Sequence, residues 1–207
     1  MEVVLDVYKR PYDANNPVIC MDETPKQLIG ETRIPIPQCP RTPAKHDYEY
    51  KRNGVCNIFM ASEPLIGKRY AKVTAYKKKG DWAMFMKSIA DKYKDASKIT
   101  LVMDNYGTHT IGSFYEVFSP EEAKALIDRF EFIYTPKHGS WLNMAEIELN
   151  VIQKQCLNRR ISETTILEKE IEAWMKARNK KKCCINWQFT THDSRIKLKR
   201  LYPTIES

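Results

Sequence analysis

Two apolar runs that each end in an aspartate restrict this chain more than any other feature of its sequence. "VICMDET" carries residues 18–21 into Asp22, and "LVMDNYGTHT" carries residues 101–103 into Asp104, which turn residues follow at once. Short apolar runs bounded by turn signals are typical of buried strands. Because the carboxyl ends of parallel strands meet at one edge of an α/β sheet, we expect the two carboxylates to converge there. Taken singly, each aspartate is more often a turn former or a helix cap.

The order of the expected elements indicates an α/β fold with a central mixed five-stranded sheet flanked by helices. Apolar runs mark the strands, and apolar residues three or four positions apart mark the helices. The proline-rich residues 34–49 predict an extended loop, because proline donates no hydrogen bond to a sheet. The expected elements are a strand at 17–22, a hairpin of 54–64 and 68–76, a helix at 81–96, a strand at 98–104, a helix that begins near Ser119, a strand at 130–136, and helices at 143–157 and 164–179.

Positive charge is concentrated toward the carboxyl terminus. The formal net charge is +8, and residues 154–200 contain thirteen Lys or Arg against five acidic residues, so this segment carries the whole excess. A basic surface of this kind usually contacts a polyanion, most often the phosphate backbone of a nucleic acid. The alternative is an ordinary lysine-rich surface in contact with water.

Several classes of protein are excluded by what the sequence lacks. No segment approaches the roughly 20 consecutive apolar residues of a membrane-spanning helix, and the amino terminus lacks the layout of a signal peptide. The six cysteines form no C-x-x-C pair of the kind that binds zinc or carries redox chemistry. We therefore expect a soluble cytoplasmic protein with reduced thiols and no membrane partner.

A third carboxylate, Glu146, lies near the expected start of the helix that follows the last strand. Three convergent carboxylates cannot all ionise comfortably unless a cation neutralises them. A hard divalent metal ion held by a few carboxylates meets this need and leaves positions for water and phosphate. Two such ions about 4 Å apart can activate a nucleophile and stabilise the leaving oxygen in phosphoryl transfer. The pattern therefore favours metal-dependent phosphoryl transfer.

Longer motifs surround these carboxylates. They are "CMDET", "LVMDNYGTH" and "YTPKHGSWLNMAEIELNVIQKQCLNRRI", with "WQFTTHDSRIKLKRLYP" at the end of the chain. Together they resemble the bacterial insertion-sequence branch of the mariner superfamily of DDE transposases, and the resemblance covers nearly the whole chain. It implies a ribonuclease H-like fold, an acidic DDE triad, dependence on Mg²⁺ with Mn²⁺ as a substitute, and DNA strand cleavage followed by strand transfer.

The resemblance implies that Asp22, Asp104 and Glu146 are the catalytic and metal-binding triad. Glu148 is a rival for the third position, but two residues further along a helix it points elsewhere. The 41 residues between Asp104 and Glu146 are more than is common in the superfamily, and we expect the extra length in the helical region of "FSPEEAKAL". This longer spacing affects the expected arrangement of helices more than the assignment of the three acids.

The same resemblance suggests roles for residues around the triad. Asn105 and His109 match the pattern after the second aspartate and contribute either to a shell around the site or only to local loop bonding. Contact with phosphate or an unpaired base is expected for residues that precede or belong to the expected helix at 143–157, or directly follow it. These nucleic-acid-binding candidates are Lys137, His138, Trp141, Lys154, Arg159 and Arg160. For Trp141 the alternative is packing in the core.

We expect residues 17–180 to form the ribonuclease H-like DDE catalytic domain. Residues 1–16 predict a linker or the remnant of a missing amino-terminal region, and residues 181–207 predict a basic carboxyl-terminal tail. The family's amino-terminal helix-turn-helix DNA reader has no counterpart in the first 17 residues. The chain is therefore expected to be a catalytic part, a truncated product, or a downstream product that joins an upstream helix-turn-helix frame.

The sequence thus predicts a transposase catalytic domain, a metal-dependent DNA endonuclease and strand transferase for cut-and-paste transposition of an insertion sequence. Its expected partners are the element ends and target DNA, on which it forms a homodimer, and its expected place is the bacterial cytoplasm beside the nucleoid. Two alternatives stay open. One is a decayed or domesticated relative that only binds DNA, and the other is a ribonuclease H-like nuclease that acts on RNA–DNA hybrids.

Overall fold

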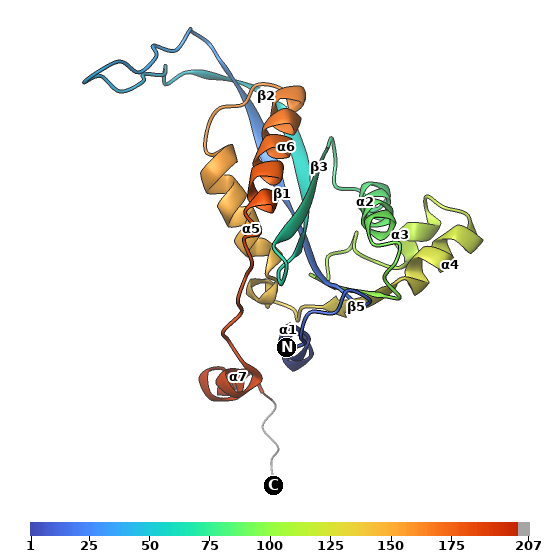
Figure 1. Cartoon of the computed structure of the whole chain (residues 1–207). Coiled ribbons are helices and arrows are strands. Elements are labelled where there is room, and N and C mark those ends of the chain that lie inside the picture. Colours follow the sequence, from blue (N-terminus) through green and yellow to red (C-terminus); the bar gives the residue numbers. More distant parts are fainter. Residues whose placement is uncertain (203–207) are drawn as a thin grey trace.

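A mixed five-stranded sheet forms the centre of the protein, as shown by a computed structural model that describes residues 1–202 (Figure 1). The strand order is β3-β2-β1-β4-β5. β1 runs antiparallel to β2 and parallel to β4, and β4 runs parallel to β5. The expected sheet is therefore confirmed, with the strands β1 (Val18–Glu31), β2 (Tyr50–Glu63), β3 (Lys68–Thr74), β4 (Ile99–Met103) and β5 (Phe130–Tyr134).

One face of the sheet is covered by three helices that follow β3 and β4 in the chain (Figure 1). These are α2 (Lys79–Lys92), α3 (Gly112–Tyr115) and α4 (Pro120–Asp128). α2 buries an apolar stripe at helical spacing, as the sequence predicted. Alternate residues of the strands point to this side, so the core here joins α2 residues Trp82, Phe85, Met86 and Ile89 to Ile19, Met21, Phe59 and Leu101.

The opposite face carries the helices that end the domain. The chain passes through a short 3₁₀ turn (Ser140–Leu142) into α5 (Ala145–Ile152), a π-helical turn (Gln153–Leu157) and α6 (Thr164–Lys180). Ile58 and Met60 of β2 face these helices and pack against Ile152, Leu157, Leu167 and Ile171. The one long helix expected at 143–157 is therefore a shorter α-helix that continues as a π-turn.

Residues 1–16 were expected to be a linker or a remnant, but they contain helix α1 (Glu2–Tyr8). Val4, Leu5 and Val7 are fully buried and pack against Val18, Cys20 and Val102 on the same face as α5. The Tyr8 hydroxyl donates a hydrogen bond to the carbonyl of Leu142 at 2.7 Å. The apolar residues of this segment are few, but their spacing places them on one side of a helix. The division of the chain at residue 16 stays a prediction.

Residues 181–207 were expected to form a basic tail, but the described part packs against the body of the protein. Ile185, Trp187 and Phe189 lie on the apolar cluster beneath α1, and the Trp187 and Tyr8 rings are 5.2 Å apart. Helix α7 (Thr191–Lys197) and a 3₁₀ turn (Lys199–Leu201) follow. The alternation of apolar and polar residues before α7 explains this packing. Residues 203–207 of the expected tail lie outside the described residues.

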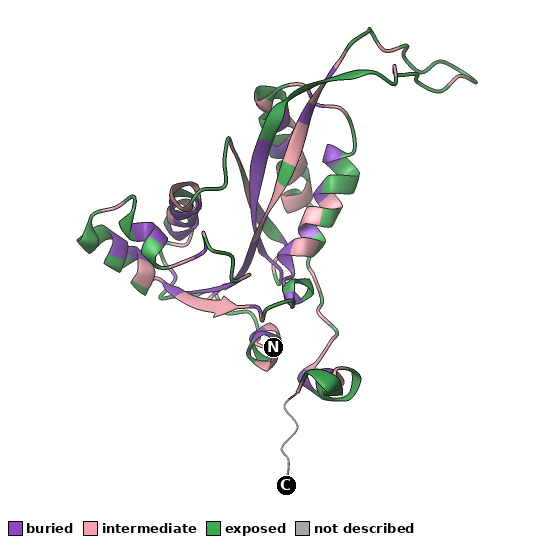
Figure 2. Ribbon diagram, turned by 180° about the vertical axis from the view of Figure 1, so that it is seen from behind, coloured by how far each residue is buried: buried purple, intermediate pink, exposed green. Residues whose placement is uncertain are grey.

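Strand β1 is much longer than the strand expected at 17–22. Its first residues pair with β4 and its later ones with β2, so it continues past Asp22 to Glu31. Residues 32–49 then form a projecting loop whose residues are largely exposed (Figures 1 and 2), which confirms the expected extended loop. No helix in the described part of the chain is long and apolar enough to cross a membrane.

A buried ion cluster joins α5 to its neighbours. Glu148 is fully buried and accepts two hydrogen bonds from Arg69 of β3, at 2.6 and 2.7 Å, and two from Arg178 of α6, at 2.8 and 3.0 Å. Burial alone would raise the pKa of the Glu148 carboxyl, but the two guanidinium groups outweigh it and hold that pKa below its usual range. The cluster therefore fixes the position and rotation of α5.

Replacing Glu148 by Gln is expected to lower the free energy of unfolding by about 3–5 kcal/mol, because it leaves two guanidinium groups partly or fully buried without their shared counter-charge. The matched control is Glu170→Gln, which breaks an ion pair with Arg159 whose two side chains are 41% and 51% exposed. That change should cost less than about 1 kcal/mol. Urea unfolding of both variants checks this, and equal losses would contradict the assignment of Glu148 as an anchor.

Candidate active site

Three carboxylates from three different elements, together with Glu23 beside the first of them, line one open hollow of about 420 Å³. Asp22 comes from β1, Asp104 directly follows β4, and Glu146 lies in the first turn of α5. Asp22 lies beyond the last residue of β1 that pairs with β4, so both aspartates reach the same edge of the sheet. The structure thus brings together the three acids that the sequence singled out, although Asp22 lies within its strand rather than at its end.

Asp22 is the most strained charge of the hollow. Burial, together with the negative charges of Glu23, Asp104 and Glu146, raises the pKa of its carboxyl to about 7. The backbone N–H of Glu23 donates to Asp22 Oδ1 at 2.8 Å and only partly offsets these effects. A bound cation would relieve this repulsion.

Asp104 already has a cationic partner. His109, which is fully buried, lies with Nδ1 2.6 Å from Asp104 Oδ1, and its Nε2 lies 3.1 Å from Glu23 Oε2 without hydrogen-bond alignment. Burial opposes the imidazolium, but the two carboxylates outweigh it and raise the pKa of His109 to about 9. Burial likewise opposes ionisation of Asp104, yet His109 holds the Asp104 pKa below its usual range. Asn105, its companion in the sequence pattern, is exposed.

The two glutamates of α5 point in different directions. Glu146 lines the hollow, whereas Glu148 lies on the buried side in the cluster with Arg69 and Arg178. Two residues along an α-helix turn a side chain by more than half a circle, which accounts for the difference. Of the two glutamates, only Glu146 therefore reaches the hollow.

Asn143 contributes to the site, and sequence reasoning did not select it. It is buried and its side-chain amide donates to the carbonyl of Met21 at 2.8 Å, while Asn143 Oδ1 accepts from the N–H of Ala145 at 3.1 Å. It thus ties β1 next to Asp22 to the first turn of α5. The available signal was the Leu-Asn pair three positions before Glu146. Glu23 was also missed as a site residue, since a carboxylate directly after Asp22 gave no sign of its contact with His109.

The donor set of the hollow suits a hard divalent cation, because the three acids offer only oxygen ligands. Within residues 1–202, however, no three His, Cys, Asp or Glu side chains lie close enough together to hold a metal ion. The acids share one hollow but stand apart, with Asp104 held by His109. The residues fit a metal chemically, and the carboxylates would have to draw closer to bind it.

The loop between β5 and α5 lies beside the acids. Ser140 lines the acid hollow, while Lys137, His138 and Trp141 line a neighbouring, largely apolar cavity of about 400 Å³ that also includes residues from both ends of the chain. The Trp141 ring is 44% exposed and meets the edge of Phe189 at 5.6 Å between ring centroids. Trp141 is therefore a half-exposed wall of this cavity and not a core residue.

The expected basic surface is only partly free to meet a ligand. Lys154 is exposed, but Arg159 pairs with Glu170, and Arg160 pairs with Glu31 and donates to the Asp47 carbonyl at the base of the projecting loop. Other arginines of residues 154–200 pair with acids from distant parts of the sequence, namely Arg178 with Glu148 and Arg195 with Glu2. A count of charges along the sequence could not reveal these pairings.

Comparison with known proteins places this chain in a family. The family described as DDE superfamily endonuclease matches residues 17–168, whereas no curated protein matches the chain. Among solved structures, a Mos1 mariner paired-end complex with Mn matches with a TM-score of 0.58 and 14% identity over 88% of this chain and 54% of that one. The Mos1 strand transfer complex matches with a TM-score of 0.58 and 14% identity over 85% and 51%.

The catalytic domain of Mos1 mariner transposase alone matches with a TM-score of 0.55 and 11% identity over 85% of this chain and 77% of that one. The chain spans about half the length of the Mos1 chains in the two complexes. At these identities the likeness establishes the fold, which is the ribonuclease H-like fold expected from the sequence. Since the family match covers most of the chain, this protein belongs to the DDE superfamily of endonucleases.

Proposed function

We propose that this chain is the catalytic part of a cut-and-paste DNA transposase that cleaves and rejoins DNA strands. The observation that carries the proposal is the gathering of Asp22, Asp104 and Glu146, from three separate elements, around one open hollow in a chain of the DDE superfamily. The motif resemblance supports the bacterial insertion-sequence branch as its origin. A bacterial protein acting on element DNA would work in the cytoplasm, beside the nucleoid.

We propose Asp22, Asp104 and Glu146 as the residues that hold Mg²⁺, or Mn²⁺ in its place. The oxygen-only donor set and the unrelieved charge on Asp22 support this. The solved Mos1 paired-end complex with Mn is a further support. When bound, such ions supply a more acidic water nucleophile and stabilise charge on the leaving oxygen.

The remaining residues of the site position these acids. His109 orients the Asp104 carboxylate, and Asn143 keeps Asp22 and the first turn of α5 in register. An attacking water and then a freed 3′-hydroxyl would each approach a phosphodiester lying over the hollow. This sequence of steps needs no covalent protein intermediate, because positioning and charge stabilisation dominate phosphoryl transfer.

The proposed partners are the DNA of the element ends and of the target, bound by a homodimer. The solved Mos1 paired-end and strand transfer complexes support this arrangement. Lys137, His138, Trp141 and the exposed Lys154 are the proposed contacts from the loop before α5 and from the helical segment that continues it. A product of an upstream helix-turn-helix frame would supply the sequence-specific contacts.

Cleavage of DNA ends by Glu146→Gln should fall to background, while its free energy of unfolding in metal-free buffer should equal or exceed that of the parent. The change removes a ligand charge and one source of repulsion on Asp22. Glu168→Gln, an exposed change on α6, serves as the control and should retain full cleavage. Gel assays on labelled duplex and on RNA–DNA hybrid check this. Preferred cleavage of the hybrid would point to the nuclease alternative.

Asp22→Asn should be more stable than the parent only at pH values where Asp22 is ionised in the unfolded parent chain. Because the folded-state pKa of about 7 lies above the ordinary aspartate pKa of 3.8, the parent loses stability as pH rises from about 4 to about 7. The variant's advantage should grow over this range to at most about 4 kcal/mol. Urea unfolding at pH 4 and pH 8 with a chelator measures it, and an equal gap at both values would refute the strained-charge account.

Trp141→Ala should reduce DNA cleavage at least ten-fold and cost little stability, because the ring is half exposed in the cavity beside the acids. Tyr12→Ala removes another half-exposed ring and should change neither property. Thermal melting beside cleavage assays makes the comparison. A stability loss of about 3–5 kcal/mol would instead assign Trp141 to the core.

A further inference from the structure

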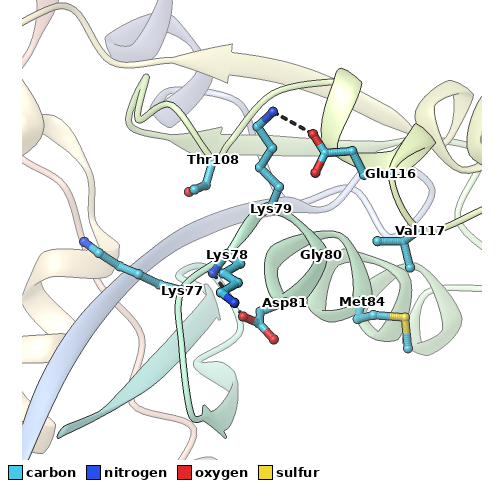
Figure 3. Close-up of a pocket in the computed structure, with 9 residues that line it drawn as sticks. All are labelled: Lys77, Lys78, Lys79, Gly80, Asp81, Met84, Thr108, Glu116 and Val117. Carbon is cyan, nitrogen blue, oxygen red and sulfur yellow. Dashed lines mark hydrogen bonds and ion pairs between the residues drawn. The ribbon is translucent and has the colours of Figure 1, made fainter.

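A run of lysines lies near the acid hollow, at the end of the connection from β3 to α2 and at the first residue of α2. Lys77, Lys78 and Lys79 line an open depression of about 650 Å³, together with Thr108 from the loop that follows Asp104 and Glu116 from the residues after α3 (Figure 3). The exposed rings of Tyr76 and Tyr106 lie beside these lysines. We call Tyr76, Lys77, Lys78, Lys79, Tyr106 and Thr108 the lysine surface.

The lysine surface is continuous with the acid hollow. Lys77 Nζ lies 3.6 Å from Glu23 Oε1, and Glu23 lines the hollow next to Asp22. The same ammonium lies 4.4 Å from the centroid of the Tyr106 ring, two residues after Asp104. In Figure 3, Lys77 points away from Lys78 and Lys79, so the three charges spread along the connection rather than gather at one point.

The positive charges are available to an external anion. Lys77 and Lys79 are each 44% exposed, and the carboxylate of Glu116, which lies 2.6 Å from Lys79 Nζ, is 51% exposed. Exposed ion pairs contribute only about 0–1 kcal/mol, so a phosphate can replace the carboxylate at little cost. Asp81 also lines the depression, but its carboxylate accepts a hydrogen bond from the Lys78 N–H at the start of α2.

Two exposed aromatic rings lie against these charges, an arrangement that suits nucleic acid. Lys78 Nζ lies 4.6 Å from the centroid of the Tyr76 ring, and the Tyr76 and Tyr106 rings are 63% and 44% exposed. Proteins that follow a nucleic-acid strand combine a basic track for the backbone with aromatic faces for the bases. An ordinary solvated lysine run does not explain two exposed tyrosines placed against its ammonium groups.

We propose that the lysine surface binds the backbone of the DNA strand that crosses the acid hollow, so that DNA is held from two sides. Lys137, His138 and Trp141 approach from the connection between β5 and α5, and Lys77 to Lys79 approach from the connection between β3 and α2. The proposal rests on the proposed action on DNA and adds a contact surface outside residues 154–200, where the sequence concentrates its basic excess.

The test compares two triple variants of equal charge change. Lys77→Ala/Lys78→Ala/Lys79→Ala removes the lysine surface, whereas Lys94→Ala/Lys98→Ala/Lys124→Ala removes three exposed lysines, two of them just before β4 at the sheet edge opposite Asp104. Affinity for a labelled DNA duplex is measured by fluorescence anisotropy between 50 and 200 mM salt with a chelator present. Each lost phosphate contact should reduce the slope of log K against log salt by about 0.9.

The lysine-surface triple should lower the slope by about two to three and the affinity at least ten-fold at 100 mM salt, while the control triple stays near the parent. Equal losses of affinity in both triple variants would mean that only net charge matters, which would overturn the proposal. Unchanged affinity in the lysine-surface triple variant would also overturn it. Because binding is measured without metal or cleavage, a parent that binds through this surface but never cleaves would refute the proposed function and leave the surface standing.

A second measurement needs no variant and so does not depend on variant folding. The parent chain is acetylated with and without duplex DNA, and mass spectrometry quantifies each lysine. DNA should protect Lys77, Lys78 and Lys79 several-fold and leave Lys94, Lys98 and Lys124 unchanged. Equal modification of the first three lysines with and without DNA would overturn the proposal.

Discussion

The fixed rotation of α5 is the constraint on which the rest of the site depends. Glu148 on its buried side receives four hydrogen bonds from Arg69 and Arg178, which belong to β3 and α6. Because Glu146 lies two residues earlier, this anchor turns it toward the acid hollow. Asn143 and the Tyr8 hydroxyl hold the segment just before the helix. A charge that has no part in the proposed chemistry thus determines where the third acid points.

Charge in the hollow is only partly balanced by the protein itself. His109, held between Asp104 and Glu23, supplies one cation, and this explains why the pKa of Asp104 is low while that of Asp22 is raised to about 7. Burial and repulsion are tolerated at Asp22 because the neighbouring core and the α5 anchor keep the elements in place. A site with this imbalance suits a ligand that brings positive charge, in keeping with the proposed metal ions.

Basic residues have two distinct uses in this fold. Arg160, Arg178 and Arg195, all within the basic segment 154–200, pair with Glu31, Glu148 and Glu2 and so join distant parts of the chain. The lysines of the β3–α2 connection belong to a part of the sequence with no net excess of charge, yet they stand exposed beside the acids. Surface position, and not charge density along the chain, therefore indicates where a polyanion can bind.

The strand and helix order and the different directions of Glu146 and Glu148 were predictable from the sequence, because apolar periodicity and helix geometry are local properties. The three acids were selected by their places after apolar runs and by the motif resemblance. The length of β1, the packing of α1 and of Trp187 and Phe189, and the π-helical turn after α5 were not predictable. The contact of Glu23 with His109 and the position of Lys77 beside the acids could not be predicted from the sequence either. These features depend on contacts between residues far apart in the chain, and only the tertiary structure decides which of many possible partners a buried or charged side chain meets.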